Sequence, residues 1–454
     1  MIKRSLKEIH KMISGSHLQS GDESIHINGI STDTRQIQEN NLYIPLVGEN
    51  FNGHTFAEKA IELGAAAIIW DKNEPNPPQN VPVLFVDNTL EALQGLAKSY
   101  RDELNVKVVG ITGSNGKTTT KDMISSVLAT TYKIHKTKGN LNNHIGLPLT
   151  ILSMSEETEI AILEMGMSGK GEIELLSAIG RPDVAVITNI GEAHLMDLGS
   201  REGIAEAKLE ITKGLKEEGT LIYYGDEPLL KEGVKDLSIR TVTFGETTEN
   251  DYFATGINQK INGTSFAVAG NEYFIPVLGK HNVNNALAAF AVGKYFSVDE
   301  QNMAAGLNKI EITGMRLELV QAENNVSVIN DAYNASPTSM NAAIHLLEDL
   351  QGFNKKIVVL GDMLELGEDE KLFHQQVGEK INEKEIAYVY AYGKLGEEIA
   401  AGAKKNIPGE RVLHFHDKEE LIADLKKKLA PGDIVLVKAS RGMRLEQVVE
   451  SILK

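Results

Sequence analysis

Short, continuously apolar runs recur through the middle of the chain, and each is followed by a turn and a helix-like stretch. Val106–Ile111 precedes a glycine-rich turn, Ile160–Leu163 precedes Glu-Met-Gly, and Asp183–Thr188 precedes Asn-Ile-Gly. Runs of this length and continuity are typical of strands that are buried on both faces of a parallel sheet. The pattern therefore predicts a parallel α/β unit in the middle of the chain.

Two stretches have a different pattern. Before about Asn105, short mixed elements surround a Pro/Asn-rich loop at Glu74–Pro82 and end in a helical pattern over Leu90–Tyr100, which indicates a small α/β domain. Within the middle region, alternating apolar segments over Tyr252–Leu278 are separated by Ile-Asn-Gly-Thr and Gly-Asn, which predicts hairpins. A helical stretch, Asn282–Tyr295, follows them.

Beyond Gly314 the strand and helix alternation resumes. The apolar runs there are Val326–Ile329, Ile357–Leu360, Ala387–Tyr392, Val412–Phe415 and Ile434–Val437. Five strands in this rhythm indicate a second doubly wound sheet. We therefore expect an α/β protein with three domains: a small N-terminal α/β domain over residues 1–105, a central domain over 106–313 with a parallel sheet and an added β-hairpin region, and a C-terminal Rossmann-like domain over 314–454.

Composition narrows the functional classes. The 454 residues include no cysteine, which excludes disulfides, thiolate zinc sites and a cysteine nucleophile. The formal net charge of −17 repels nucleic acid and acidic membrane surfaces, so we expect neither as a partner. The charged start, MIKRSLKEIHKMISG, lacks the apolar core of a secretion signal, and no apolar run approaches the roughly 20 residues of a membrane span. A cytoplasmic protein without membrane insertion is expected.

The strongest chemical motif is the segment Gly110–Thr120, with the sequence GITGSNGKTTT, between a predicted strand and a predicted helix. Its glycines allow the backbone to wrap a phosphate chain, Lys117 supplies a cation to the outer phosphates, and Thr118 can hold Mg²⁺. The strict motif requires glycine where Ile111 stands, so this is a variant P-loop. We therefore expect the central domain to be a P-loop ATPase domain with a parallel sheet. The alternative is a glycine-rich turn with an incidental lysine.

Three residues further along the chain are weaker candidates. Glu164 ends a predicted strand, where an open parallel sheet places its ligand crevice, and a carboxylate there can bind Mg²⁺; a solvated or helix-capping residue is the alternative. His194 follows the next strand and can reach the same crevice as a neutral metal ligand, although a lone loop histidine is usually a surface residue. Lys208 on a predicted helix is, by composition alone, a solvated lysine.

These segments, in this order and over essentially the whole chain, resemble the Mur ligases, which build the cytoplasmic peptidoglycan precursor by adding amino acids or a dipeptide to a UDP-sugar. Thr112–Thr118 is similar to the ATP loop of that family, and Asn140–Thr150 resembles its segment near the UDP-sugar and the metals. The resemblance implies that Glu164 and His194 occupy magnesium-binding positions and that Lys208 is carboxylated by CO₂. It thus implies ATP, two Mg²⁺ ions and a lysine carbamate at Lys208 as cofactors.

The resemblance also assigns the remaining site residues. The catalytic and metal-binding residues that it implies are Lys117, Thr118, Glu164, His194 and Lys208. The ATP contacts that it implies are Thr112, Gly113, Ser114, Asn115, Gly116, Lys117 and Thr118 in the loop, Asn282 and Asn285 near the adenine, and Arg316, Asp331 and Tyr333 near the ribose and phosphates. The substrate contacts that it implies are Ser31, Asp33, Arg35, Phe51 and His54 in a UDP-sugar-binding first domain, Asn140, Asn142, Asn143 and His144 in the centre, and Asn334, Lys438, Ser440 and Arg441 in a last domain that binds the incoming dipeptide.

Within the family, Asp331–Pro337 (DAYNASP) is typical of the member that adds a dipeptide, and the chain contains no Asp-Asn-Pro-Arg segment of the kind that selects diaminopimelate. We therefore expect an ADP-forming ligase that joins D-alanyl-D-alanine to the UDP-N-acetylmuramoyl-tripeptide through an acyl phosphate, working as a monomer. Because the expected ATP contacts come from the last two domains, closure of the third domain should complete the site.

Two alternatives stay open from the sequence. A folylpolyglutamate synthase would share the P-loop and the lysine but not the UDP-sugar-like first region. A P-loop switch protein that hydrolyses nucleotide to regulate a partner is the alternative from a different class, although the chain contains no Asn-Lys-x-Asp segment for reading guanine.

Overall fold

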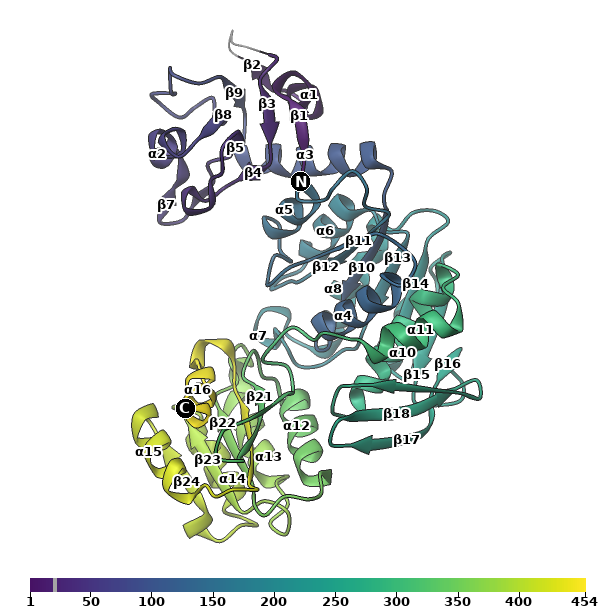
Figure 1. Ribbon diagram of the computed structural model, residues 1–454, viewed down its shortest axis with the longest axis vertical. Coiled ribbons are helices and arrows are strands. Elements are labelled where there is room, and N and C mark those ends of the chain that lie inside the picture. The colour runs from purple at the N-terminus through teal and green to yellow at the C-terminus, as the bar shows by residue number, and fades with distance from the viewer. Residues whose placement is uncertain (19–22) are drawn as a thin grey trace.

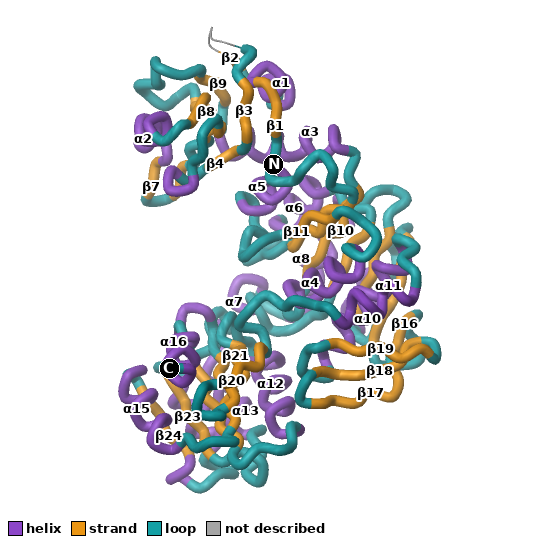
Figure 2. The backbone as a smooth tube through the Cα atoms, viewed as in Figure 1, coloured by secondary structure: helices purple, strands orange, loops and turns teal. Residues whose placement is uncertain are grey.

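The computed structural model describes residues 1–18 and 23–454, and Figures 1 and 2 show them as a crescent with the N-terminal and C-terminal regions at its two ends. The N-terminal region holds a sheet in the order β2 (His17–Leu18), β9 (Val83–Val86), β8 (Ala65–Asp71), β5 (Asn41–Tyr43) and β4 (Ile30–Ser31). Two short pairs accompany it, namely β1 (Lys3–Ser5) with β3 (His26–Asn28), and β6 (Val47–Gly48) with β7 (Phe51–Asn52). The helices are α1 (Leu6–Met12), α2 (Ala57–Glu62) and α3 (Thr89–Leu104). The helix expected at Leu90–Tyr100 is therefore confirmed.

The central region is built on a seven-stranded sheet in which every neighbouring pair is parallel. Its strand order is β11 (Ile134–Lys136), β12 (Ile160–Glu164), β10 (Lys107–Thr112), β13 (Val184–Ile187), β14 (Thr220–Tyr224), β15 (Arg240–Gly245) and β16 (Tyr252–Phe253). The strands β10, β12 and β13 lie where the continuous apolar runs predicted them. Alternate residues of β10 point to opposite faces: Val108 packs in one core and Val109 in the other, which is why the run is apolar throughout.

Helices cover both faces of the central sheet. They are α4 (Lys117–Leu128), α5 (Gly146–Leu152), α6 (Glu172–Gly180), α7 (Leu195–Leu198), α8 (Arg201–Leu209), α9 (Pro228–Val234), α10 (His281–Tyr295) and α11 (Glu300–Asn308). The expected hairpin region is confirmed as an antiparallel sheet of β17 (Thr255–Lys260), β18 (Gly263–Val268) and β19 (Asn271–Ile275).

The C-terminal region carries a six-stranded sheet in the order β20 (Glu318–Gln321), β21 (Ser327–Asp331), β25 (Ile434–Lys438), β22 (Lys356–Gly361), β23 (Tyr388–Tyr392) and β24 (Val412–Phe415). The five predicted strands are confirmed and pair in parallel. The edge strand β20, which the apolar pattern did not reveal, pairs antiparallel with β21. The helices are α12 (Pro337–Asp349), α13 (Glu370–Glu379), α14 (Gly396–Ala403), α15 (Lys418–Lys428) and α16 (Glu446–Leu453).

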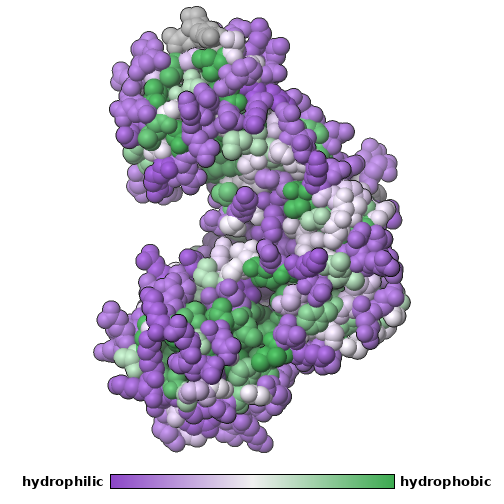
Figure 3. Space-filling model, viewed as in Figure 1, coloured by the Kyte–Doolittle hydropathy of each residue, from purple (hydrophilic) through white to green (hydrophobic). Residues whose placement is uncertain are grey.

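The N-terminal and central regions share a hydrophobic core, whereas the C-terminal sheet has cores of its own. One core runs without interruption from the N-terminal region into the central sheet, and the backbone of Ile2 donates a hydrogen bond to the carbonyl of Leu152 (2.8 Å). The C-terminal sheet has its own two cores. Figure 3 shows that the surface is deeply hollowed between the two ends of the crescent. In the part of the chain that the structure describes, no helix is both long enough and apolar enough to cross a membrane.

Candidate nucleotide-binding and ligation site

The phosphate loop connects β10 to α4 and requires glycine at two positions. Gly113 has φ +147°, and a Cβ atom there would lie 1.8 Å from Oγ1 of Thr188. Gly116 has φ +79°, and a Cβ atom there would lie 2.7 Å from Oδ1 of Asn285. Both the backbone conformation and the close neighbours therefore exclude side chains. Thr188, directly after β13, and Asn285 on α10 crowd these glycines and fix the shape of the loop.

Lys117 begins α4 and folds back over the loop. Its Nζ donates a hydrogen bond of 2.7 Å to the carbonyl of Gly113. Burial lowers the pKa of this ammonium, the carboxylate of Glu164 opposes part of the shift, and the nearby Arg316 guanidinium adds to it. The cation is thus held at the mouth of the loop by a neutral carbonyl, which leaves its charge available to an anion.

Glu164 ends β12 next to the same helix. Thr118 donates from Oγ1 to Oε2 of Glu164 (2.9 Å), and Asn142 donates from Nδ2 to Oε1 (2.9 Å). Glu164 is 2% exposed, so this carboxylate is buried and accepts hydrogen bonds from neutral groups only. A hydroxyl and a carboxylate in contact beside a phosphate loop form the oxygen donor set that Mg²⁺ prefers.

His194 and Lys208 lie in the connection between β13 and β14. Nδ1 of His194 lies 2.8 Å from Oε2 of Glu365 in the C-terminal region, but this nitrogen is buried without an aligned hydrogen bond. Lys208 is 1% exposed and has no hydrogen-bond or ion-pair partner within the described ranges. Burial lowers the pKa of Lys208 well below its usual value, and the charge of Lys117 lowers it further. Both effects favour the neutral amine over the ammonium at this position.

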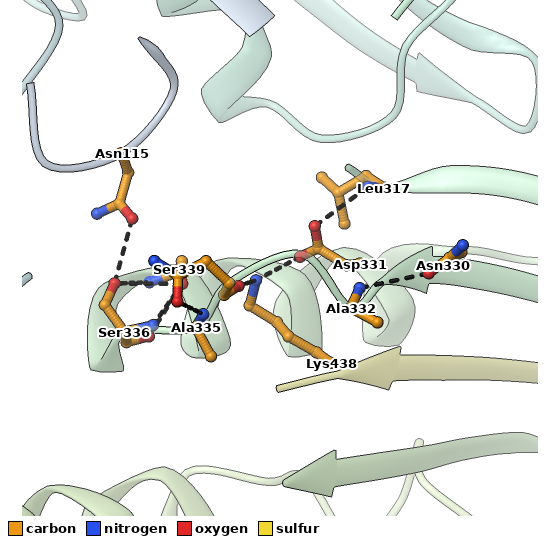
Figure 4. A network of polar contacts seen from close by, with 10 residues as sticks. Asn115, Leu317, Asn330, Asp331, Ala332, Ala335, Ser336, Ser339 and Lys438 are labelled. Carbon is orange, nitrogen blue, oxygen red and sulfur yellow. Dashed lines mark hydrogen bonds and ion pairs between the residues drawn. The ribbon is translucent and has the colours of Figure 1, made fainter. Parts of the chain in front are cut away.

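The C-terminal region supplies a second set of polar groups. The guanidinium of Arg316 stacks over the ring of Tyr333, with 4.2 Å between Cζ and the ring centre. In Figure 4, Asp331 accepts from the backbone N–H of Leu317 (3.2 Å) and from Nζ of Lys438 (2.5 Å). Nε of Arg316 is buried without a partner, so this side chain still has a donor to offer.

Several polar contacts join the C-terminal region to the loops of the central sheet, among them Lys280 with the carboxylate of Asp349 (2.9 Å). Ser336 donates from Oγ to Oδ1 of Asn115 in the phosphate loop (3.2 Å), as Figure 4 shows. Thr338 donates from Oγ1 to Oε2 of Glu192 (2.6 Å). Glu365 lies against His194 and also accepts from the backbone N–H of Met196 through its carbonyl (3.3 Å). The start of α12 therefore touches the phosphate loop directly.

These groups line one cavity of about 620 Å³ between the two regions. Of the residues expected from the sequence, its wall contains Ser114, Asn115, Gly116, Lys117, Thr118, Asn140, Asn142, Asn143, Glu164, His194, Asn282, Asn285, Arg316, Asp331, Tyr333, Asn334 and Lys438. Thr112 and Gly113 lie in the strand end and loop that form its floor, and Lys208 is buried in α8. The structure thus brings together most of the residues that were far apart in the sequence.

The five expected residues of the N-terminal region do not reach this cavity. Ser31, Asp33 and Arg35 form a local turn, in which Ser31 donates to the carbonyl of Asp33 (2.9 Å) and Arg35 pairs with the Asp33 carboxylate (2.7 Å). Phe51 is 51% exposed and stacks on Phe56. Asp33, Arg35 and Phe51 thus leave polar and aromatic groups open to a ligand, whereas Ser31 is buried and its hydroxyl is used within the turn.

His54 has a different environment from its four neighbours. It is 4% exposed, its Nδ1 lies 2.9 Å from Oδ1 of Asn52, and its Nε2 accepts from the N–H of Asp71 (3.3 Å). Both ring nitrogens are therefore used inside the fold. The geometry favours a packing role for His54 beside Trp70, whose ring it meets edge-on.

Three other expected substrate residues also lie outside the cavity wall. His144 is exposed, and its carbonyl accepts from Gln94 (3.0 Å). Oγ of Ser440 accepts from the N–H of Leu364 (2.9 Å). Arg441 pairs with Glu446 (3.0 Å) and lies against the sulfur of Met315 (3.4 Å).

The sequence reasoning missed several residues of the cavity wall. These are Thr188, Asn189, His281, Asn284, Glu246, Tyr224, Thr338 and Ser339. Thr188 ends the strand predicted at Asp183–Thr188, Asn189 directly follows it, and His281 precedes Asn282. The carboxyl ends of parallel strands meet at one edge of the sheet, so this rule could have identified Tyr224 and Glu246 as well.

Together, the fold and the site define a nucleotide-binding α/β protein with a P-loop at the carboxyl edge of a parallel sheet and a second sheet that closes the cavity. Three family descriptions match the chain: "Mur ligase family, catalytic domain" over residues 26–101, "Mur ligase middle domain" over 111–293 and "Mur ligase, glutamate ligase domain" over 315–441. The chain belongs to the Mur ligase family.

Individual relatives match along the full length. A UDP-N-acetylmuramoyl-tripeptide–D-alanyl-D-alanine ligase from Bacillus subtilis is 55% identical, and the match covers 100% of this chain and 99% of that protein. A crystal structure of MurF from Acinetobacter baumannii aligns with a TM-score of 0.91 at 29% identity, over 100% of this chain and 99% of that one. MurF ligase from Thermotoga maritima in complex with ADP aligns with a TM-score of 0.83 at 30% identity, over 94% and 97% of the two chains.

Proposed function

We propose that this protein uses ATP to join D-alanyl-D-alanine to the UDP-N-acetylmuramoyl-tripeptide, forming the pentapeptide precursor of peptidoglycan in the cytoplasm. The observation that carries the proposal is the single cavity in which the phosphate loop, Glu164 and the Arg316–Tyr333 pair face one another. The full-length relatives support the choice of substrates, because the Bacillus subtilis protein bears the name of this reaction.

The reaction starts with an encounter of two anions. The terminal carboxylate of the tripeptide attacks the γ-phosphorus of ATP, an acyl phosphate forms and ADP leaves. The amine of D-alanyl-D-alanine then attacks the acyl carbon, phosphate leaves, and the amine proton is released. Lys117 offsets the repulsion in the first step and stabilises charge on the transferring phosphoryl group.

The site residues fit a role for Mg²⁺. Thr118 and Glu164 place two oxygen donors in contact (2.9 Å), and His194 lines the same cavity. Within the described ranges, no three His, Cys, Asp or Glu side chains cluster closely enough to hold a metal by themselves, so further donors are needed. A carbamate on Lys208 would supply them, since a neutral buried amine is the form that adds CO₂. When bound, the metal ions supply positive charge beside the phosphates.

The remaining assignments follow the architecture. We assign residues 1–105 to the UDP-sugar, 106–313 to ATP and 314–454 to the incoming dipeptide. In the first of these regions, Asp33, Arg35 and Phe51 offer exposed groups, and the buried Ser31 holds the turn that presents Asp33 and Arg35. Asn285 on α10 lies beside Gly116 and donates to Asn282 (2.8 Å), and both serve the nucleotide. Lys438 at the end of β25 lines the cavity and meets the dipeptide. The protein works as a monomer in this proposal.

Phosphate release and product mass test the proposal together. The purified protein is incubated with ATP, Mg²⁺ and the UDP-N-acetylmuramoyl-tripeptide, with and without D-alanyl-D-alanine. The expected result is one phosphate released per pentapeptide formed, with little release when the dipeptide is omitted.

Two results would contradict it. Phosphate release that does not depend on the amine, without a peptide product, would favour a nucleotide switch. Glutamate transfer to a folate in a parallel reaction, without transfer to the UDP-sugar peptide, would favour a folylpolyglutamate synthase. Lys117→Ala is the matched control, because it removes the loop cation and should abolish the release.

A further inference from the structure

A buried carboxylate on the P-loop helix binds the segment that leads into the C-terminal sheet. Asp122 lies on α4, one turn after Thr118, and its side chain is fully buried. Its Oδ2 accepts two hydrogen bonds from Thr313, one from the backbone N–H (2.9 Å) and one from Oγ1 (2.8 Å). Residue 313 is 191 positions away in the sequence, so this contact is purely tertiary.

Two lysines hold the Asp122 carboxylate in place. Lys136 on β11 donates from Nζ to Oδ1 (2.8 Å), and Nζ of Lys121 lies 3.6 Å from the same oxygen. The two carboxylate oxygens therefore differ in their partners, because Oδ1 meets the cations of the central region and Oδ2 is left for Thr313. A charged acceptor makes a stronger hydrogen bond than a neutral one.

Thr313 lies where the chain passes from one core to the next. Ile310 and Ile312 pack in the core around α4 and α10, whereas Leu317 packs in the core of the C-terminal sheet. The segment between α11 and β20 has no regular structure, and Met315 (φ 63°) and Leu317 (φ 52°) adopt left-handed backbone conformations. The hydrogen bonds to Asp122 thus form the last side-chain anchor before the strained turn.

Arg316 occupies the middle of that turn. Its guanidinium stacks on Tyr333 and lines the cavity, and its Nε is buried without a partner. A side chain on a strained turn keeps its direction only if the backbone on both sides is fixed. Leu317 is fixed on one side by the bond to Asp331 (3.2 Å), and Thr313 is fixed on the other by Asp122.

We propose that Asp122 is a positioning residue that anchors Thr313 to the P-loop helix and thereby aims Arg316 at the bound nucleotide. Helix α4 then contributes to the site in two ways. Lys117 and Thr118 at its start meet the phosphates, and Asp122, one turn later, holds Thr313 and thereby the turn that carries Arg316. The inference rests on the proposed function only in taking Arg316 as a nucleotide contact.

The anchor is tested first without any ligand. Hydrogen–deuterium exchange is measured over residues 309–317 in the wild type and in Thr313→Val, Thr313→Ser and Asp122→Asn. Thr313→Val keeps the shape of the side chain but removes the hydroxyl donor, so faster exchange is expected, and Thr313→Ser should restore the wild-type rate. Ser126→Ala is the matched control, because it removes another α4 hydrogen bond, to the carbonyl of Gly306 (2.7 Å), away from the turn.

The consequence is tested by titrating ADP with Mg²⁺ into the same proteins. Loss of one hydrogen bond to a charged acceptor should weaken ADP binding by roughly tenfold in Thr313→Val. In an Arg316→Ala background the same substitution should have no further effect, because the anchor acts through Arg316.

Three results separate the possible failures. Exchange in Thr313→Val that equals that of Ser126→Ala would overturn the anchor. An equal loss of ADP affinity with and without Arg316 would overturn its action through that residue. Absence of ADP binding in the wild type would instead overturn the proposed function, and the exchange experiment would still report on the anchor because it uses no ligand. The midpoint of thermal unfolding of Thr313→Val should equal that of Ser126→Ala. Asp122→Asn weakens the same contact from its other side and is the second variant for this test.

Discussion

Substitution of Gly113 by alanine adds a single methyl group and thereby tests the geometry of the phosphate loop. The new Cβ atom would lie 1.8 Å from Oγ1 of Thr188 and 3.1 Å from its backbone nitrogen, and the backbone has φ +147°. Thr188 cannot yield freely, because its hydroxyl donates to the carbonyl of Asn115 (2.6 Å). The substitution must therefore strain the backbone and break this hydrogen bond.

The magnitude follows from these two effects. An unfavourable backbone conformation costs roughly 1–3 kcal/mol, and a lost hydrogen bond costs about 0.5–1.5 kcal/mol more. The total of at least about 1.5 kcal/mol corresponds to roughly tenfold or more in an equilibrium constant. If the loop keeps its shape, the cost lowers the free energy of unfolding; if the loop relaxes, it weakens ATP binding.

Both quantities are measured by urea unfolding and by calorimetric titration with an ATP analogue. Gly171→Ala is the matched control, because Gly171 also has a positive φ (+84°) but nothing within 4 Å of the added methyl group. The control should show the backbone cost alone. If Gly113→Ala matched Gly171→Ala in both stability and nucleotide affinity, the reasoning about the loop would be refuted.

Three further predictions address separate parts of the site. Lys208→Met should preserve folding but lower the ligation rate by about a hundredfold, and depletion of bicarbonate should slow the wild type but not the variant; equal rates in the two proteins would contradict the carbamate. Arg316→Lys should raise the KM for ATP about fivefold, since an ammonium cannot stack flat on Tyr333, and steady-state kinetics will show whether kcat changes less than KM. Burial lowers the pKa of His374, whose Nε2 accepts from the N–H of Met363 (2.8 Å), so the folded state binds fewer protons than the unfolded one. Stability should therefore be complete above the unfolded pKa of about 6.5 and decline as the pH falls below it, and His374→Gln should flatten that decline in urea titrations; a steeper decline would contradict the sign.

The parallel sheets could be predicted from the sequence because a strand that is buried on both faces is a continuous run of apolar residues. The strands β10, β12 and β13 are short apolar runs, and the carboxyl-end rule placed Glu164 beside the loop. The edge strand β20 has no such apolar run, since most of its residues are exposed. An edge strand that is buried on neither face carries polar residues and reads as a loop.

Contacts between distant segments could not be predicted in the same way. The bonds of Asp122 to Thr313 and of Ser336 to Asn115 join residues 191 and 221 positions apart, and no spacing in one sequence encodes them. Lys208 illustrates the same limit: on its helix it reads as a solvated lysine, and only the packing of α8 against the sheet buries it. The family resemblance, and not the residue pattern, selected it.

The position of the triphosphate is the most direct test of the account. A crystal of the protein with a non-hydrolysable ATP analogue and Mg²⁺ should show the γ-phosphate within contact distance of Lys117 Nζ, with metal density beside Thr118 and Glu164. The adenosine should extend along α10 toward Asn282, under Arg316. A triphosphate bound elsewhere, with the loop from Gly113 to Thr118 unchanged and empty, would contradict the central claim.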